Sequence, residues 1–104
     1  MQHNVIALVL PPPTENQLLQ RIRAFAVGSE SMRLDHPHFQ ERLKERGLNM
    51  RQVIETVRKG CAVGTPKLDE WGDWRIKLRR VVAGRRVQVV VAVKSDHFVV
   101  VTVI

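Results

Sequence analysis

Three residues suited to proton and phosphate chemistry recur at intervals of four within DHPHFQERLKERG, residues 35–47: they are His38, Arg42 and Arg46. Residues four apart lie on one helical face, so the spacing predicts a row along a helix that begins at Pro37. The helix dipole opposes an imidazolium in the first turn and so favours a neutral histidine base. Arginine offers a fork of donors to phosphate. Metal-free RNA cleavage needs both, because the 2′-hydroxyl must lose a proton while charge builds on the phosphorus.

The same stretch has an ordinary structural explanation. Arg42 with Glu45, and Glu41 with Lys44, are i,i+3 pairs that are typical of an exposed charged helix. In that interpretation His38 only caps the helix or packs against it. The spacing alone favours this ordinary interpretation, so the catalytic one depends on further evidence.

The distribution of charge is a second feature. The chain of 104 residues carries 17 Lys and Arg against 10 Asp and Glu, a formal net charge of +7. Residues 74–95 contain no acid, and the basic and acidic residues of the remaining chain balance. A concentrated basic patch typically faces a polyanion, whereas a solvated strand face that protects a sheet edge is the alternative. The basic residues of this segment are Arg75, Lys77, Arg79, Arg80, Arg85, Arg86 and Lys94.

Apolar residues at helical spacing predict helices in the first part of the chain. Thr14 with Gln17 forms a capping-box pattern, which indicates a helix over about 15–27. The helix from Pro37 to Arg46 is expected to be capped by Asp35 or His36 and to stop at Gly47. A third helix is expected to begin after Asn49 and to end at Gly60.

After Gly60 the apolar period changes to two, which predicts strands. Residues 61–73 are expected to be loop-like, although CAV at 61–63 can start a strand. Strands then follow over about 74–82, 86–93 and 98–104. Helices followed by an antiparallel meander indicate a single α+β domain.

The alternation also predicts the faces of the sheet. Arg75, Lys77 and Arg79 share a side with Arg86 if the first hairpin loop has an even number of residues. The opposite side is expected to pack on the helices. A three-residue loop after Lys94 would place residue 102, a threonine, on the basic side, and a two-residue loop would send it to the core.

The pattern His38-x3-Arg42-x3-Arg46-Gly47, followed by Leu48-Asn49 and an amphipathic helix, resembles a widespread family of small bacterial proteins of unknown function. In that family H-A-x-x-R-x-x-E-R-G-I-S precedes a short helix and a meander whose last strand reads V-V-T-V. Here HFQERLKERGLN and VVVTVI match. The resemblance covers residues 32–104 and leaves 1–31 as an N-terminal extension with one helix.

The family is similar in layout to the RelE, ParE and BrnT toxins of toxin–antitoxin pairs, in which helices precede a curved antiparallel sheet. This resemblance implies a RelE-like α+β core and a metal-independent endoribonuclease that needs no cofactor. Implied partners are RNA, either free or on the ribosome, and a neutralising antitoxin protein. In the implied site His38 is a general base or acid, Arg42 and Arg46 hold phosphate, Thr102 lines the site, and the RNA backbone follows Arg75, Lys77, Arg79 and Arg86.

Two other interpretations remain open. The first is a non-catalytic module that binds nucleic acid or an acidic protein through residues 74–95. The second is an accessory protein in which the basic patch only maintains solubility. Trp71 and Trp74 can stack on bases beside the basic residues, or one of them can anchor the core.

Other chemistries have weaker support. The HPH sequence at 36–38 suggests metal ligands together with Asp35 and His97, but nothing fixes their geometry, so no metal site is predicted. The single cysteine, Cys61, excludes an internal disulfide and fits a reducing cytosol. VIALVL at 5–10 is too short to span a membrane and lacks the features of a signal peptide, so we expect a cytoplasmic protein.

Overall fold

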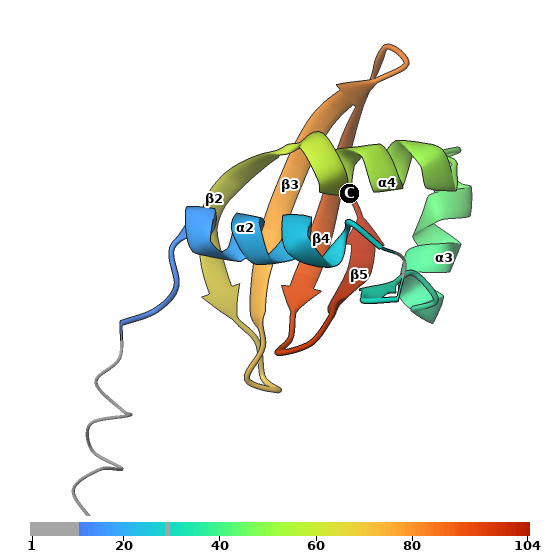
Figure 1. Cartoon of the computed structure of the whole chain (residues 1–104). Coiled ribbons are helices and arrows are strands. Elements are labelled where there is room, and N and C mark those ends of the chain that lie inside the picture. The colour runs from blue at the N-terminus through green and yellow to red at the C-terminus, as the bar shows by residue number, and fades with distance from the viewer. Residues whose placement is uncertain (1–10, 29) are drawn as a thin grey trace, which may run out of the picture.

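The computed structural model describes residues 11–28 and 30–104, in which three helices pack on a five-stranded sheet (Figure 1). The part of the predicted extension before Pro11, VIALVL included, lies outside the described residues. The elements in chain order are α2 (Glu15–Phe25), β1 (Met32–Arg33), α3 (Pro37–Glu45), α4 (Met50–Lys59), β2 (Cys61–Leu68), β3 (Trp74–Val82), β4 (Arg85–Val93) and β5 (Phe98–Val103).

The sheet has the order β1-β5-β4-β3-β2. Strands β3 to β5 form the predicted antiparallel meander, and β2 extends it by a further antiparallel strand. Strand β1, however, pairs with β5 in parallel. The α+β class is therefore confirmed, while the expectation of a purely antiparallel sheet is wrong: the sheet is mixed and open. A parallel pair needs a long crossover, and here the chain between β1 and β5 passes through α3, α4 and three strands.

The predicted helices form where their caps are. Thr14 and Gln17 make both hydrogen bonds of a capping box at the start of α2, and Asn49 and Gln52 do the same for α4. The cap of α3 is His36, whose Nδ1 accepts a hydrogen bond from the backbone N–H of His38 at 3.1 Å. Each cap satisfies backbone donors that have no partner inside the helix.

Strand β2 was not expected as a strand of this length. It runs over the eight residues Cys61–Leu68, which the sequence indicated to be mostly loop. The strand lies at the edge of the sheet, so it has no apolar face with a period of two to signal it. Its register with β3 also shifts between Val63 and Lys67, around Gly64, whose φ is +75°.

The hairpin of β3 and β4 confirms the predicted faces. Its turn consists of two residues, Ala83 and Gly84, and both have positive φ, as a tight hairpin turn requires. Leu78 therefore pairs with Val89 on the side that packs on the helices, and Lys77 pairs with Val90 on the other side. Arg75, Lys77 and Arg79 share this second side with Arg86, as the even loop predicted.

Thr102 reaches the basic side by a route that the sequence did not indicate. The β4–β5 turn closes with a hydrogen bond from the Lys94 N–H to the His97 carbonyl at 2.9 Å, which leaves only two residues at its tip. Such a turn was expected to send Thr102 to the core. Instead the register shifts at Val101, so that Thr102 pairs with Val90 while Val103 remains buried.

All three helices contribute to one core on one side of the sheet, and Figure 1 shows α2 and α4 across that side. Leu18 and Ile22 of α2, Phe39 of α3 and Val53 of α4 are fully buried there. We call the other side the open face, because no helix of residues 11–28 and 30–104 covers it. None of the helices in the described part of the chain is long and apolar enough to cross a membrane.

Gly60 tests how closely α4 and β3 pack. A Cβ on this residue would lie 2.9 Å from the carbonyl oxygen of Arg79 and even closer to that of Thr56, both of which are backbone atoms. We expect Gly60→Ala to lower the free energy of unfolding by about 2 kcal/mol or more, because neither carbonyl can move without disturbing its element. Urea unfolding measures the change.

Gly28→Ala is the matched control, because within residues 11–28 and 30–104 no atom beyond Gly28 and its chain neighbours lies within 4 Å of the added Cβ. Its free energy of unfolding should stay within about 0.5 kcal/mol of the unmodified protein. Equal effects of the two substitutions would show that the contact between the end of α4 and β3 is looser than the structure has it.

Candidate nucleic-acid interface

The open face gathers basic side chains from three neighbouring strands. Lys67 of β2 is paired with Arg75 of β3, and Lys77 and Arg79 follow on the same side of β3. Arg86 of β4 points to this side as well, opposite Val81. Alternate residues of a strand are roughly 6.6 Å apart, so the cations form a continuous basic surface.

Four of these cations have no protein partner in the described part of the chain. Lys67, Lys77, Arg79 and Arg86 make no ion pair and donate no side-chain hydrogen bond within the residues that the structure describes. Their like charges repel one another without compensation from a nearby carboxylate. Such a surface favours binding of a polyanion.

Other arginines are used to hold the fold together. Arg85 donates to the carbonyls of Gly47 at 2.9 Å and Arg46 at 2.8 Å, which lie at the end of α3. Arg58 donates to the Ala26 carbonyl at the end of α2. These guanidinium groups satisfy carbonyls that helix ends leave without partners, so they belong to the architecture rather than to the interface.

A hollow of about 430 Å³ lies on the open face beside the β2–β3 loop. Its apolar part consists of Ala92, Val99 and Val101, which come from β4 and β5. We call it the Trp71 hollow. The complete lining is His36, Asp69, Trp71, Asp73, Arg75, Ala92, Lys94, Val99 and Val101.

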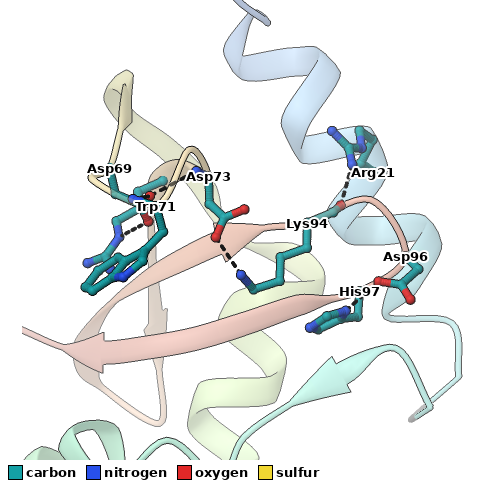
Figure 2. Close-up of polar contacts among 8 residues, drawn as sticks. Arg21, Asp69, Trp71, Asp73, Lys94, Asp96 and His97 are labelled. Atoms are coloured by element: carbon teal, nitrogen blue, oxygen red, sulfur yellow. Dashed lines mark hydrogen bonds and ion pairs between the residues drawn. The ribbon is translucent and has the colours of Figure 1, made fainter.

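Asp69 organises the loop that borders this hollow (Figure 2). Its Oδ1 accepts hydrogen bonds from the backbone N–H groups of Trp71 and Asp73, both at 2.9 Å, and its Oδ2 accepts from Arg75 Nε at 3.0 Å. The pKa of Asp69 is lowered, first by the backbone hydrogen bond from Asp73 and then by those from Arg75 and Trp71. The ionised carboxylate thus holds the loop and Arg75 in one arrangement.

Lys94 connects this loop to the rest of the molecule. Its Nζ lies 2.5 Å from Oδ2 of Asp73, and its carbonyl accepts a hydrogen bond from Arg21 of α2, as Figure 2 shows. One residue therefore links the β2–β3 loop, the end of β4 and α2. The nearby His97 is bound to Asp96, 2.6 Å from Nδ1 to Oδ1, and this hydrogen bond lowers the pKa of Asp96.

The row predicted on α3 is only partly brought together. Arg42 Nε donates to the Val103 carbonyl at 3.5 Å, and Thr102 Oγ1 donates to the same oxygen at 3.1 Å, so these two side chains meet. His38 and Arg46 are exposed at the two ends of the helix. None of these four residues lines the Trp71 hollow.

The histidine that lines the hollow is His36, which the sequence indicated only as a helix cap or a weak metal ligand. Its ring centroid lies 6.4 Å from that of His38, so His38 lies close to the hollow without lining it. Asp69 and Asp73 were expected only to lie in the loop-like segment 61–73, and no local pattern distinguishes them from other loop acids. Within the described ranges, no three His, Cys, Asp or Glu side chains are grouped to hold a metal ion.

Residues 36–104 match a family described as Domain of unknown function (DUF4258), and the chain belongs to this family. No curated protein and no solved structure matches the chain. The match confirms the predicted relationship to a small uncharacterised family. It extends from α3 to β5 and contains the Trp71 hollow and the cations of the open face, while α2 precedes it.

The lowered pKa of Asp69 predicts a pH dependence. Asp69→Asn keeps one oxygen for the two backbone N–H groups but removes the charge that faces Arg75. A carboxyl whose pKa is lower in the folded than in the unfolded protein stabilises the fold. This stabilisation is complete when the pH is above the ordinary pKa of 3.8, and it is lost as the pH falls below that value. We therefore expect the unmodified protein to lose more stability than Asp69→Asn between about pH 6 and about pH 2.5. Urea unfolding at both pH values is the measurement.

Glu70→Gln is the control, because Glu70 is an exposed acid of the same loop. Glu70→Gln should lose as much free energy of unfolding between the two pH values as the unmodified protein does. Parallel losses of stability in the unmodified protein and Asp69→Asn would contradict the assigned role of the Asp69 carboxylate.

Proposed function

We propose that this DUF4258 protein binds single-stranded RNA along its open face. One observation carries the proposal: four cations that have no partner among the described residues lie together on the open face, the side of the sheet that the described helices leave uncovered. They are Lys67, Lys77, Arg79 and Arg86. Alternate residues on a strand are roughly 6.6 Å apart, a spacing suited to successive phosphates of an extended strand. Affinity of this kind is electrostatic and depends steeply on salt.

Binding to a fluorescent RNA oligomer, followed by anisotropy at several salt concentrations, tests the proposal. Lys77→Ala and Arg79→Ala should each weaken binding and lower the slope of log affinity against log salt by about 0.7, because one phosphate contact is lost. Both side chains point away from the core, so neither substitution should impair folding.

Arg51→Ala supplies the control, because Arg51 carries the same charge and is exposed but belongs to α4 rather than to the open face. It should leave the affinity and the salt slope nearly unchanged. If Arg51→Ala weakens binding as much as Lys77→Ala does, the attraction is a general effect of net charge, and the open face is not the interface.

A specific observation also favours a second function, RNA cleavage. Arg42 and Thr102 converge on the Val103 carbonyl, and His38 is exposed one turn earlier on the same helix. The order of helices before the β2–β5 meander supports a RelE-like relationship, in which a neutralising antitoxin would be a further partner. The basic open face is the surface that an acidic segment of such a protein would cover.

In this second function His38 takes the proton from a 2′-hydroxyl, and the oxygen attacks the adjacent phosphorus. The bond to the 5′-oxygen breaks, and that oxygen receives a proton, which leaves a 2′,3′-cyclic phosphate. Arg42 and Arg46 stabilise the charge that develops on the phosphoryl oxygens. Arg42 Nε is bound to Val103 and Nη1 lies 3.5 Å from Glu45, so Nη2 is the nitrogen left for phosphate.

Induced expression in bacteria distinguishes cleavage from binding. The unmodified protein should arrest growth and fragment messenger RNA, whereas His38→Ala should do neither. Its affinity for RNA in vitro should stay within about twofold, because His38 is not one of the four cations proposed to contact phosphates. Growth curves and RNA electrophoresis measure the effects. Normal growth with intact RNA under both proteins would remove the nuclease candidate and leave the binding function.

A further inference from the structure

We propose that the Trp71 hollow is the base subsite of this interface: one nucleobase of the bound RNA enters it and stacks on Trp71. The proposal rests on the proposed function, because it names the part of the RNA that this end of the open face takes. Four features of the hollow carry it: the exposed indole, the neighbouring guanidinium, the apolar floor and the balance of charge.

Trp71 is held in place and yet is 71% exposed. The carboxylate of Asp69 fixes its backbone N–H, and Gly72, with φ at +85°, closes the loop directly behind it. Trp74, three residues further along, packs against the core. The loop thus holds the Trp71 ring in water, although Trp74 nearby is partly buried. A large aromatic ring held exposed in this way is suited to stacking on a ligand.

The Arg75 guanidinium lies over one face of the Trp71 indole. Its guanidinium carbon lies 5.9 Å from the ring centroid, over the ring, and Asp69 holds its Nε at 3.0 Å. The Arg75 side chain is therefore arranged before RNA arrives, which reduces the entropy lost on binding. Indole and guanidinium planes both stack on bases.

The floor of the hollow is apolar and has room for one base. Ala92, Val99 and Val101 form it, and the register shift at Val101 helps to place this side chain there. A volume of about 430 Å³ lies at the small end of ligand sites, which span roughly 300–1,000 Å³.

The charges of the hollow distinguish a base from a phosphate. Arg75 is paired with Asp69, and Lys94 is paired with Asp73, so two carboxylates balance the two cations. A phosphate would meet both carboxylates, whereas a neutral base can donate to Asp73 and accept from Lys94. The hollow thus suits the neutral part of a nucleotide, and the unpaired cations along the open face suit its phosphates.

Anisotropy with two labelled probes of equal length tests the proposal on the full chain: an RNA oligomer and an abasic ribose-phosphate oligomer. The unmodified protein should bind the RNA oligomer about 5- to 100-fold more tightly, the range expected for one base stack. Trp71→Ala should remove this preference without changing affinity for the abasic probe. Trp71→Phe should retain part of it, and Lys77→Ala should weaken both probes by the same factor.

The outcomes separate this inference from the proposed function. Equal affinity of the unmodified protein for both probes, unchanged in Trp71→Ala, would overturn the base subsite and leave the interface intact. If neither probe binds at low salt, the base subsite and the proposed function are both overturned. As a second readout, unlabelled RNA should quench tryptophan emission of the unmodified protein but not of Trp71→Phe, whose remaining Trp74 packs against the core.

Discussion

Strands β3 and β4 pair along nine residues each and are joined through only two, Ala83 and Gly84. The positive φ angles of these two residues give the turn a twist that matches the strands and holds one register. A slip of β3 by one residue would carry Lys77 and Arg79 into the core and expose Leu78. Burial of unpaired charge is expensive, so the register that forms the core is also the register that builds the basic surface.

The excess of positive charge divides into two groups with different physical roles. Arg23, Arg58 and Arg85 donate to backbone carbonyls at or next to the ends of helices and strands, where they replace missing partners. Lys77 and Arg79 have no such partner within the described chain. Composition and clustering cannot separate these groups: on β4, for example, Arg85 binds a backbone carbonyl whereas the adjacent Arg86 belongs to the open face.

Local features were predictable from the sequence, and contacts between distant segments were not. The caps at Thr14 and Asn49 predicted helices because a capping box involves only four consecutive residues. The alternation on β3 and β4 predicted both faces of the sheet. The register shift at Val101 has no local signature, so the correct side for Thr102 could not be derived.

The candidate site shows the same limit more clearly. Sequence reasoning chose His38 for its spacing to Arg42, whereas the histidine that lines the hollow is His36. That position depends on β1 running parallel to β5, which brings the start of α3 beside Val99 and Val101. The sequence did not indicate the parallel pair, and for the edge strand β2 it indicated only a possible start at residues 61–63. Both strands border the open face.

The acids of the β2–β3 loop serve the fold and the character of the site at once. Asp69 and Asp73 hold the loop through Arg75 and Lys94, and in doing so they neutralise those two cations. At one end of the open face the charges are therefore balanced and aliphatic side chains form the surface. The remainder of the face carries cations that have no partner among the described residues. A surface divided in this way favours a ligand whose neutral aromatic part and anionic backbone alternate along its length. A uniformly charged polyanion would use only the cations outside the two ion pairs, so under the proposed function the two ion pairs are the feature that would favour nucleic acid over such a polyanion.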